Sequence, residues 1–424
     1  MTMTNSKYYH AHQIVGERCK GRLKCVRHCP TKALRIRDNK ITFLQDLCID
    51  CGNCINVCPE DAFVPVSDSL EDFKSFKYHV AMPCVVLYVQ FGPDIHPLVI
   101  NQALKNIGFD EIANVAKVCD EVGFALRHHL ELHPEVRPLI SSFCPATVRF
   151  IQVSYPNLVK YISPLDVPRE IVARGLKYHY SKKLGIKIEE IGVTYITPCT
   201  AKIVSIKQPA EKERSWIDGA IPINDIYNRI TPEIIKIQQE KTVNIKDNYD
   251  FGRAWGIVGH FSQNVGTEKA LSVAGIDHVK LVLDDIENEK LHNIDFVEAL
   301  ACLHGCANGV FCVKDPYMAR HNSILLQEKF GRPNPIDKQE VLENYNKGYY
   351  HSESPVLPRV TRVSPADIAT SIKRMNKKER IYAKLPKKDC SLCGAPTCET
   401  FADDCARNEA DITDCIFFSN KEAR

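Results

Sequence analysis

The stretch ISSFCPATVRF, residues 140–150, holds one cysteine, Cys144, between an apolar run and a proline. Its nearest cysteines along the chain are Cys119, 25 residues before it, and Cys199, 55 residues after it. The run RPLISSF, residues 137–143, has the pattern of a buried strand, so Cys144 is expected at a strand exit. The role of this thiol therefore depends on which other residues the fold brings beside it.

The residues around Cys144 alternate between strand-like and helix-like patterns from about residue 76 to residue 350. The clearest segments are the strand-like runs 77–91 and 191–197 and the helix-like runs 95–109 and 167–185. Such alternation predicts an α/β fold with a parallel sheet that is covered on both faces. In sheets of this kind, ligands bind beyond the carboxyl ends of the strands.

Three further cysteines fit a site at that edge of the sheet. Cys199 follows the strand-like IGVTYIT, so it is also expected at a strand exit. Cys302 and Cys306, in EALACLHGCANG, are four residues apart, a spacing at which one helical turn presents both sulfurs to one site. Together with Cys144, these cysteines can hold one metal cluster.

Composition limits the alternatives. A chain of 424 residues predicts roughly two to four domains, and a formal charge of +3 argues against a nucleic-acid partner. The N-terminus has no secretory signal pattern, and the longest uncharged run, residues 79–93, is too short to span a bilayer, so no membrane partner is expected. Nineteen cysteines, an odd number, indicate metal binding in a reducing cytoplasm rather than disulfides.

Two copies of a ferredoxin motif precede this body, at residues 19–34 and 48–63. The second is a full C-x2-C-x2-C-x3-C-P run, in which three thiolates bind one 4Fe-4S cube and the fourth binds a second cube. On this logic, cluster II takes Cys29, Cys48, Cys51 and Cys54. Cluster I takes Cys19, Cys25 and Cys58, together with whatever stands at position 22.

Position 22 is an arginine, which is a poor iron ligand. Cluster I is therefore 3Fe-4S, or 4Fe-4S with a foreign ligand or water on one iron, or absent. A disulfide or zinc module is disfavoured because both copies keep the Cys-Pro ending. Three leftover cysteines in apolar settings are expected to be packing thiols, with a small chance that one completes cluster I: Cys84, Cys119 and Cys312.

A third cysteine block lies near the C-terminus, in CSLCGAPTCETFADDCARNEADITDC, residues 390–415. It predicts a four-thiolate site, iron-sulfur rather than zinc, on Cys390, Cys393, Cys398 and Cys415. Cys405 lies in an expected helix and is interpreted as packing. The block is similar to the small C-terminal 4Fe-4S domain of several redox proteins.

The segments SSFCPATVRFIQ, TPCTAK and EALACLHGCANG resemble, in order and separation, the three signature segments of the FeFe-hydrogenases. The wording of the first two, the DGAI segment at 218–221 and the C-terminal block resemble the sensory branch of that family most. The resemblance implies a two-lobed parallel-sheet core. The expected domains are an N-terminal α+β dicluster ferredoxin domain (1–75), the core (76–350), a linker (351–370) and a small helical 4Fe-4S domain (371–424).

The resemblance also implies a cofactor, the H-cluster. This is a 4Fe-4S cube on Cys144, Cys199, Cys302 and Cys306, in which Cys306 also bridges to a diiron unit that carries CO, cyanide and a dithiolate. Lys202 matches the family lysine that hydrogen-bonds a cyanide. Hydrogenase maturation proteins, which install the diiron unit, are expected partners, and H2 is the expected ligand.

Departures from the catalytic members concern the proton path. The residue before the first ligand is normally a cysteine that relays protons, and here it is Phe143, whose ring neither gives nor accepts a proton. Gly123 and Phe124 stand where catalytic members carry acids. Weak hydrogenase activity is therefore expected.

Other positions near the expected site also differ. Thr197 and Leu300 replace methionines that flank the metal in catalytic members. His304 is a candidate replacement proton group, because histidine side chains exchange protons near physiological pH. A solvent-facing or hydrogen-bonded histidine is the simpler interpretation, and the same holds for His260.

Three functions follow. The first is a low-turnover H2 sensor that relays electrons through 4Fe-4S clusters to a separate redox or signalling protein, because no output domain follows Cys415. The basic run 371–388 is either a solvated face or a docking surface for such a partner. The second is a working hydrogenase with a rerouted proton path through Ser141, Ser142, groups beside Cys199 or His304. The third is an electron-transfer or scaffold protein that lacks the diiron unit.

Overall fold

The computed structural model describes residues 8–241, 243, 255–330, 335–361 and 368–419. Part of the expected linker, at 362–367, and the last five residues of the expected C-terminal domain lie outside the described residues. The chain divides into two compact units. Unit 1 consists of Met1–Pro65 together with Arg359–Arg424, and unit 2 consists of Val66–Pro358.

The described residues of unit 2 form two parallel sheets. The larger has the strand order β6-β5-β8-β9, with β6 at Glu111–Ile112, β5 at Tyr78–Pro83, β8 at Ile191–Thr197 and β9 at Gly219–Pro222. The smaller has the order β10-β11-β7, with β10 at Ala270–Ala274, β11 at Phe296–Leu300 and β7 at Leu139–Ile140. The prediction of an α/β core built on parallel strands is confirmed.

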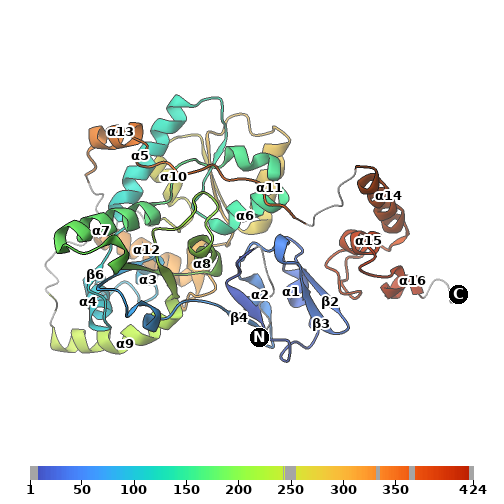
Figure 1. Ribbon diagram of the computed structural model, residues 1–424, viewed down its shortest axis with the longest axis horizontal. Helices are drawn as coiled ribbons and strands as arrows, with labels where there is room; N and C mark the ends of the chain where they lie inside the picture. The colour runs from blue at the N-terminus through green and yellow to red at the C-terminus, as the bar shows by residue number, and fades with distance from the viewer. Residues whose placement is uncertain (1–7, 242, 244–254, 331–334, 362–367, 420–424) are drawn as a thin grey trace. The chain divides into compact units, whose positions relative to one another are not determined.

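Helices surround these strands (Figure 1). The α-helices of unit 2 are α3 (Val86–Val89), α4 (Pro97–Asn106), α5 (Ala116–Leu132), α6 (Pro145–Ser154), α7 (Pro168–Leu184), α8 (Thr200–Lys207), α9 (Ile223–Glu240), α10 (His260–Val265), α11 (Ile276–Glu287), α12 (Pro316–Phe330) and α13 (Lys338–Asn346). The 3-10 helices are η2 (Leu70–Phe73), η3 (Pro156–Tyr161), η4 (Ile188–Glu190) and η5 (Gly305–Asn308). Among the packed pairs are α4 with α9, α5 with α10 and α3 with α12.

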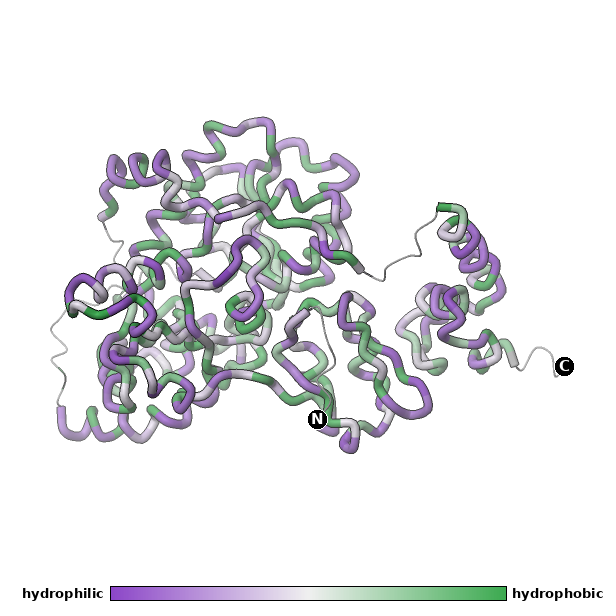
Figure 2. The backbone as a smooth tube through the Cα atoms, in the orientation of Figure 1, coloured by the Kyte–Doolittle hydropathy of each residue, from purple (hydrophilic) through white to green (hydrophobic). Residues whose placement is uncertain are grey.

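The strands follow from runs of β-branched and apolar residues. β8 has the sequence IGVTYIT and is buried along its whole length, as expected for a central strand covered on both faces. The run 77–91 is strand only as far as Pro83, after which α3 begins, because an apolar run of this length is equally compatible with a buried helix. Figure 2 shows hydrophobic segments concentrated among the central strands.

Unit 1 joins the two ends of the chain. Its N-terminal part pairs β1 (His12–Ile14) with β4 (Phe63–Pro65) and β2 (Leu34–Arg37) with β3 (Lys40–Phe43), all antiparallel. Three short helices connect these strands, α1 (Lys24–Arg27), η1 (Gln45–Leu47) and α2 (Asn53–Val57). The C-terminal part consists of α14 (Ile368–Lys384), α15 (Cys398–Ala406), η6 (Ile412–Asp414) and α16 (Ile416–Ser419).

A buried ion pair explains why the two expected iron-sulfur domains share one unit. The carboxylate of Asp404 is 1% exposed and accepts hydrogen bonds from Arg35 and Arg37 of β2. The backbone of Ile36 donates to the carbonyl of Gly394 at 2.8 Å. Gly394 has a φ of +79°, and a Cβ there would lie 1.8 Å from the carbonyl oxygen of Ile36, so only glycine fits. Sequence patterns within either half carry no signal for this contact.

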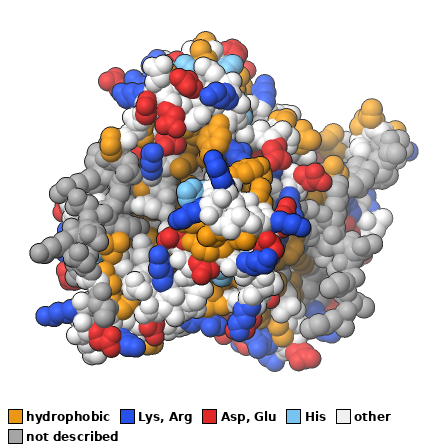
Figure 3. Space-filling view, turned by 60° about the vertical axis from the view of Figure 1, so that its left-hand side comes forward, with side chains coloured by type: hydrophobic (Ala, Val, Ile, Leu, Met, Phe, Trp, Pro, Cys, Tyr) orange, Lys and Arg blue, Asp and Glu red, His pale blue; other side chains and the backbone are white. Residues whose placement is uncertain are grey.

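Two surface features bear on partners. None of the described helices combines the length and the apolar character needed to cross a bilayer. On the face drawn in Figure 3, basic and acidic side chains are interspersed with hydrophobic ones, so no single sign of charge dominates it. This mixture agrees with the near-neutral formal charge of +3.

Candidate functional site

The cysteines expected at strand exits lie where the parallel sheets end. Cys144 is the N-cap of α6 and follows β7, and Cys199 is the N-cap of α8 and follows β8. Cys306 lies in η5, after β11. The carboxyl ends of strands from both sheets therefore supply the sulfurs, as the strand pattern predicts.

The charges of Cys144 and Cys199 affect the pKa of Cys306, which indicates that these three sulfurs lie close together. Burial raises the pKa of Cys306 to about 12, Lys202 opposes the rise, and Cys199 and Cys144 add to it. Burial likewise raises the pKa of Cys199, with opposition from Lys202 and a further increase from Cys144. Thiols this close together form a donor set that suits a metal, because a metal displaces their protons.

The CLHGC turn differs from the expected helical turn. Cys302 lies in a bend, and η5 begins only at Gly305, whose φ is +65°. A Cβ at Gly305 would lie 2.2 Å from the carbonyl oxygen of Gly256, and the backbone of Cys306 donates to that same oxygen at 2.7 Å. The close approach of Gly256 therefore breaks the helix and fixes Cys306.

Lys202 projects from α8 into the core beside Cys306. It is 1% exposed, and its Nζ donates to the Cys306 sulfur at 3.0 Å. Burial lowers the pKa of Lys202, but Cys306, Tyr195 and Cys84 outweigh that effect, so the pKa lies well above its usual value. The side chain is therefore a buried ammonium directed at the sulfur site.

Phe143 belongs to a cluster of aromatic rings. Its ring meets Trp255 edge-on at 5.7 Å and Phe261 at 6.3 Å between centroids, while Trp255 and Phe261 stack at 3.6 Å. The Nζ of Lys202 lies 4.9 Å from the centre of the Phe143 ring. Phe143 is 8% exposed, so an apolar side chain occupies the space between the ammonium and the aromatic cluster.

Two cysteines interpreted as packing thiols, Cys84 and Cys312, lie at this site. Cys84 follows β5, donates its N–H to the carbonyl of Ile196 at 3.1 Å and raises the pKa of Cys306. Cys312 lies within reach of the Cys306 carbonyl, with a sulfur-to-oxygen distance of 3.3 Å. Cys84 follows a strand just as Cys144 does, and that signal could have identified it. The position of Cys312 depends on the η5 turn and had no such signal.

Four further positions that differ from catalytic members are located by their own contacts. Thr197 is buried and accepts from the N–H of Cys199 at 3.4 Å. Leu300 is buried at the end of β11. The ring of His304 packs against Tyr317 at 4.2 Å, and Gly123 is buried in α5, where a Cβ would lie 2.9 Å from the Cβ of Asn264.

In unit 1, a small cavity is lined by the four cysteines expected for cluster II, Cys29, Cys48, Cys51 and Cys54. The three expected cluster I cysteines are also grouped, because burial, Cys58 and Cys19 together raise the pKa of Cys25 to about 11. Arg22 is turned to the surface, where its Nε lies 3.2 Å from Glu60.

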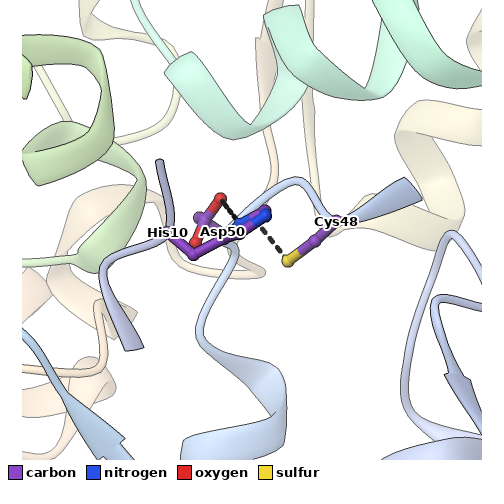
Figure 4. A group of neighbouring side chains, drawn as sticks. All are labelled: His10, Cys48 and Asp50. Atoms are coloured by element: carbon purple, nitrogen blue, oxygen red, sulfur yellow. Dashed lines mark hydrogen bonds and ion pairs between the residues drawn. The ribbon is translucent and has the colours of Figure 1, made fainter. Parts of the chain in front are cut away.

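Sequence reasoning missed a polar group beside cluster II. Figure 4 shows His10 and Asp50 next to Cys48. Asp50 accepts from the Nδ1 atoms of His10 at 3.0 Å and His12 at 3.3 Å. Burial opposes the charged carboxylate, but the two histidines hold the pKa of Asp50 well below its usual value. The short motif spacing that identifies the cysteines carries no signal for these residues.

The C-terminal block forms a second sulfur-lined cavity, around Cys390, Cys393, Cys398 and Cys415. Cys405 does not line it and packs instead in an apolar cluster that contains Phe401. Both cavities therefore offer the four-sulfur donor set that iron-sulfur cubes require.

Family comparisons match all three parts of the chain. Residues 77–267 match the family described as iron only hydrogenase large subunit, C-terminal domain. Residues 12–59 match the 4Fe-4S dicluster domain, and residues 385–417 match a family of Fe-S cluster segments.

The curated proteins that resemble this chain share low sequence identity with it over part of its length. The chain is 26% identical over 194 residues to the NADP-reducing hydrogenase subunit HndD of Solidesulfovibrio fructosivorans, covering 40% of this chain and 32% of that protein. It is 23% identical over 264 residues to iron hydrogenase 1 of Clostridium pasteurianum, covering 52% and 46%. A match to a cytosolic Fe-S cluster assembly factor NAR1 homolog of Schizosaccharomyces japonicus is 32% identical over 72 residues, covering 17% and 14%. The chain thus spans less than half the length of each relative.

Similar solved structures include variants of the [FeFe]-hydrogenase HydA1 from Chlamydomonas reinhardtii. One has 17% sequence identity and a TM-score of 0.48, and covers 67% of this chain and 95% of that chain. Another has 16% identity and a TM-score of 0.49, and covers 69% and 97%.

Proposed function

Since the chain carries an FeFe-hydrogenase H-cluster domain between a 4Fe-4S dicluster domain and a C-terminal Fe-S domain, we propose that it is a low-turnover H2 sensor. The resemblance inferred from the sequence is confirmed by these matches. Assignment to the sensory branch is part of the proposal, as is the assignment of Cys144, Cys199, Cys302 and Cys306 as H-cluster ligands. When bound, the H-cluster supplies H2 binding and redox chemistry.

The side chains around the sulfurs favour binding over turnover. Lys202 presents a buried ammonium 3.0 Å from the Cys306 sulfur, where it can hold an anionic ligand such as a cyanide in place. Phe143 and its aromatic neighbours place apolar rings beside the same ammonium. An ammonium that orients the cofactor is therefore combined with a wall through which protons do not pass.

The observation that carries the proposal is the position of Phe143. Its buried ring lies 4.9 Å from the Lys202 ammonium, where catalytic members are expected to have the cysteine that relays protons. A phenyl ring has no exchangeable proton, so each catalytic cycle is slowed at proton transfer. H2 binding needs no such transfer and remains intact.

A separate partner is proposed to receive the signal. Helix α14 is exposed and carries basic residues, together with two exposed hydrophobic side chains, Ile372 at 48% and Met375 at 55%. Basic and apolar groups on one exposed helix suit an acidic protein surface with an apolar centre. The partner is therefore proposed to be an acidic redox or signalling protein.

Infrared spectroscopy tests the assembly of the site. Protein co-produced with hydrogenase maturation proteins should show CO and cyanide stretches that shift when H2 is added. Turnover should then rise at least ~10-fold in Phe143→Cys and stay low in Phe143→Leu, which keeps the apolar wall. Bands that shift with H2, combined with an equally high rate in wild type and Phe143→Cys, would contradict the sensor and favour a working enzyme with another proton path.

A second candidate is an iron-sulfur protein that never receives the diiron unit. The match to a cytosolic Fe-S cluster assembly factor favours it. It predicts full iron-sulfur loading without CO or cyanide bands. The match of Lys202 to the family lysine that hydrogen-bonds a cyanide argues against it, because that role has no purpose without the diiron unit.

A further inference from the structure

Two arginines from the N-terminal part of unit 1 contact the segment that carries the C-terminal cysteines. Arg37, the last residue of β2, donates from Nη1 to the carbonyl of Cys393 at 2.8 Å. Arg27, the last residue of α1, donates from Nη2 to the carbonyl of Cys390 at 2.5 Å. Both cysteines line the C-terminal sulfur cavity, so two cations from the other end of the chain reach the backbone of its proposed ligands.

The charge of Arg37 is not cancelled by the acid beside it. Asp404 accepts from both Nε and Nη2 of Arg35, so one guanidinium already matches this carboxylate. Arg37 donates to Oδ2 of the same carboxylate at 2.8 Å. Two arginines therefore share one anion, and because a guanidinium stays protonated, a net positive charge remains beside Cys393.

This positive charge is partly shielded from solvent and acts on a sulfur. The side chain of Asp404 is 1% exposed and that of Arg37 is 23% exposed. Burial raises the pKa of Cys393, with further increases from Cys415 and Cys390. Arg37 opposes this rise, so its charge is felt at the Cys393 sulfur as well as at the carbonyl.

The backbone keeps Arg37 in this place. The N–H of Ile36 donates to the carbonyl of Gly394 at 2.8 Å, so the residues next to Arg37 and Cys393 are joined directly. A Cβ on Gly394 would lie 1.8 Å from the carbonyl oxygen of Ile36, which shows how closely the two segments approach. Arg37 is therefore held at the cysteine segment by its strand.

Other charges that contact the segment are exposed. Arg27 is one, and Asp389, which accepts from the N–H of Cys398 at 2.7 Å, is another. Their signs are opposite, and water and salt screen exposed charges more than partly buried ones. Arg37 is therefore expected to have the larger effect, and Arg27 a smaller one in the same direction.

An iron-sulfur cluster that accepts one electron becomes more negative by one charge, so a fixed cation nearby favours its reduced state. We propose that Arg37, assisted by Arg27, raises the reduction potential of the C-terminal Fe-S cluster. The electron comes from a low-potential one-electron donor. The proposal rests on the cluster of the C-terminal domain and not on the proposed H2 chemistry, so either can fail without the other.

The same coupling acts in the opposite direction. If the contact with Arg37 favours the reduced cluster, reduction must strengthen that contact by the same free energy. The hydrogen bond from Ile36 to Gly394 should therefore open less often in the reduced protein than in the oxidised protein. The redox state of the C-terminal cluster is in this way transmitted to β2.

The test is a reductive titration of the full chain, loaded with iron-sulfur clusters, with dithionite as the electron donor and electron paramagnetic resonance as the readout. The signal that Cys415→Ala removes belongs to the C-terminal cluster. At a fixed potential, Arg37→Gln should lower the ratio of reduced to oxidised cluster about tenfold, which is about 59 mV for one electron. Arg37→Lys keeps the charge and should stay near wild type. Arg18→Gln, which removes an exposed cation from the same part of unit 1, should not change the midpoint.

Two results in this titration would overturn the proposal. One is an equal midpoint in wild type and Arg37→Gln. The other is an equal fall in Arg37→Lys and Arg37→Gln, because the effect would then follow from altered packing and not from charge. If Arg37→Gln does not retain the cluster, Arg27→Gln takes its place, with an expected fall of about threefold, or about 28 mV. An unchanged midpoint in Arg27→Gln would then reject the proposal.

Hydrogen exchange followed by mass spectrometry gives a second readout. The peptide that contains Ile36 should exchange more slowly in reduced than in oxidised wild type, and this difference should shrink in Arg37→Gln. Exchange at the same rate in both redox states of wild type would contradict the coupling between the cluster and β2.

Discussion

The carboxylate of Asp404 in α15 accepts a hydrogen bond from the guanidinium of Arg35 in β2 at 3.1 Å, across 369 residues of sequence. Arg37 donates to the same carboxylate at 2.8 Å. Both iron-sulfur parts of unit 1 therefore depend on one buried acid.

Asp404→Asn tests this dependence. The substitution leaves two arginines beside a neutral amide, and breaking a buried ion pair in this way typically costs ~3–5 kcal/mol. Unit 1 should unfold at lower denaturant concentration, as followed by loss of iron-sulfur absorbance. Asp403→Asn is the matched control, because Asp403 is partly exposed and pairs locally with Arg407, the C-cap of α15, at 2.9 Å. Equal midpoints for the two variants would count against the role of Asp404.

Arg22→Cys tests the nature of cluster I. A thiolate at position 22 would complete a four-sulfur set with Cys19, Cys25 and Cys58, so a 3Fe-4S cluster should become 4Fe-4S. Iron analysis should show a gain of about one iron per chain, and the electron paramagnetic resonance signal of an oxidised 3Fe-4S cluster should disappear. Arg22→Ser is the control for loss of the ion pair with Glu60. The same iron content in all three proteins would mean that wild type already holds a complete cube or no cluster there.

Lys202→Met tests the buried ammonium. Removing it leaves the Cys306 site without its cation and without a donor at 3.0 Å. The intensity of the cyanide and CO bands should fall at least ~10-fold, while the absorbance of the unit 1 clusters should not change. Lys207→Met, on the same helix but paired with Asp68 near the surface, should keep full intensity. Full intensity in Lys202→Met would show that the buried ammonium is not needed to hold the diiron unit.

The pH dependence of unfolding should show the effect of His129. Burial, together with His133 and His351, lowers the pKa of His129 to about 4, although Glu135 opposes the shift. The unfolded chain therefore binds a proton near pH ~6.5 that the folded chain binds only near pH 4, so stability falls as the pH drops between these values. His129→Gln should lose less stability over this range than wild type in denaturant titrations. The exposed His179 provides the control substitution, His179→Gln, and identical slopes for His129→Gln and wild type would contradict the shift.

Features encoded in short spacing were predictable. The ferredoxin run places Cys48, Cys51 and Cys54 close together in one short segment. Strand periodicity places Cys144 and Cys199 at strand ends. Local geometry determines both features, so a single sequence reveals them.

Features that depend on distant segments were not predictable. The breaking of the CLHGC turn depends on Gly256, and the Asp404 contact depends on β2. The residues that make these contacts have no distinctive sequence pattern of their own, so a single sequence does not reveal the contacts.

The two parts of unit 1 are made at different times during synthesis. Because its two parts are separated by the whole of unit 2, residues 1–65 leave the ribosome long before residues 359–424. Until α15 is made, the guanidinium groups of β2 lack their carboxylate and the backbone of Ile36 lacks its acceptor at Gly394. Strand β2 is therefore an open edge in the nascent chain until the synthesis of α15, more than 350 residues later, closes it.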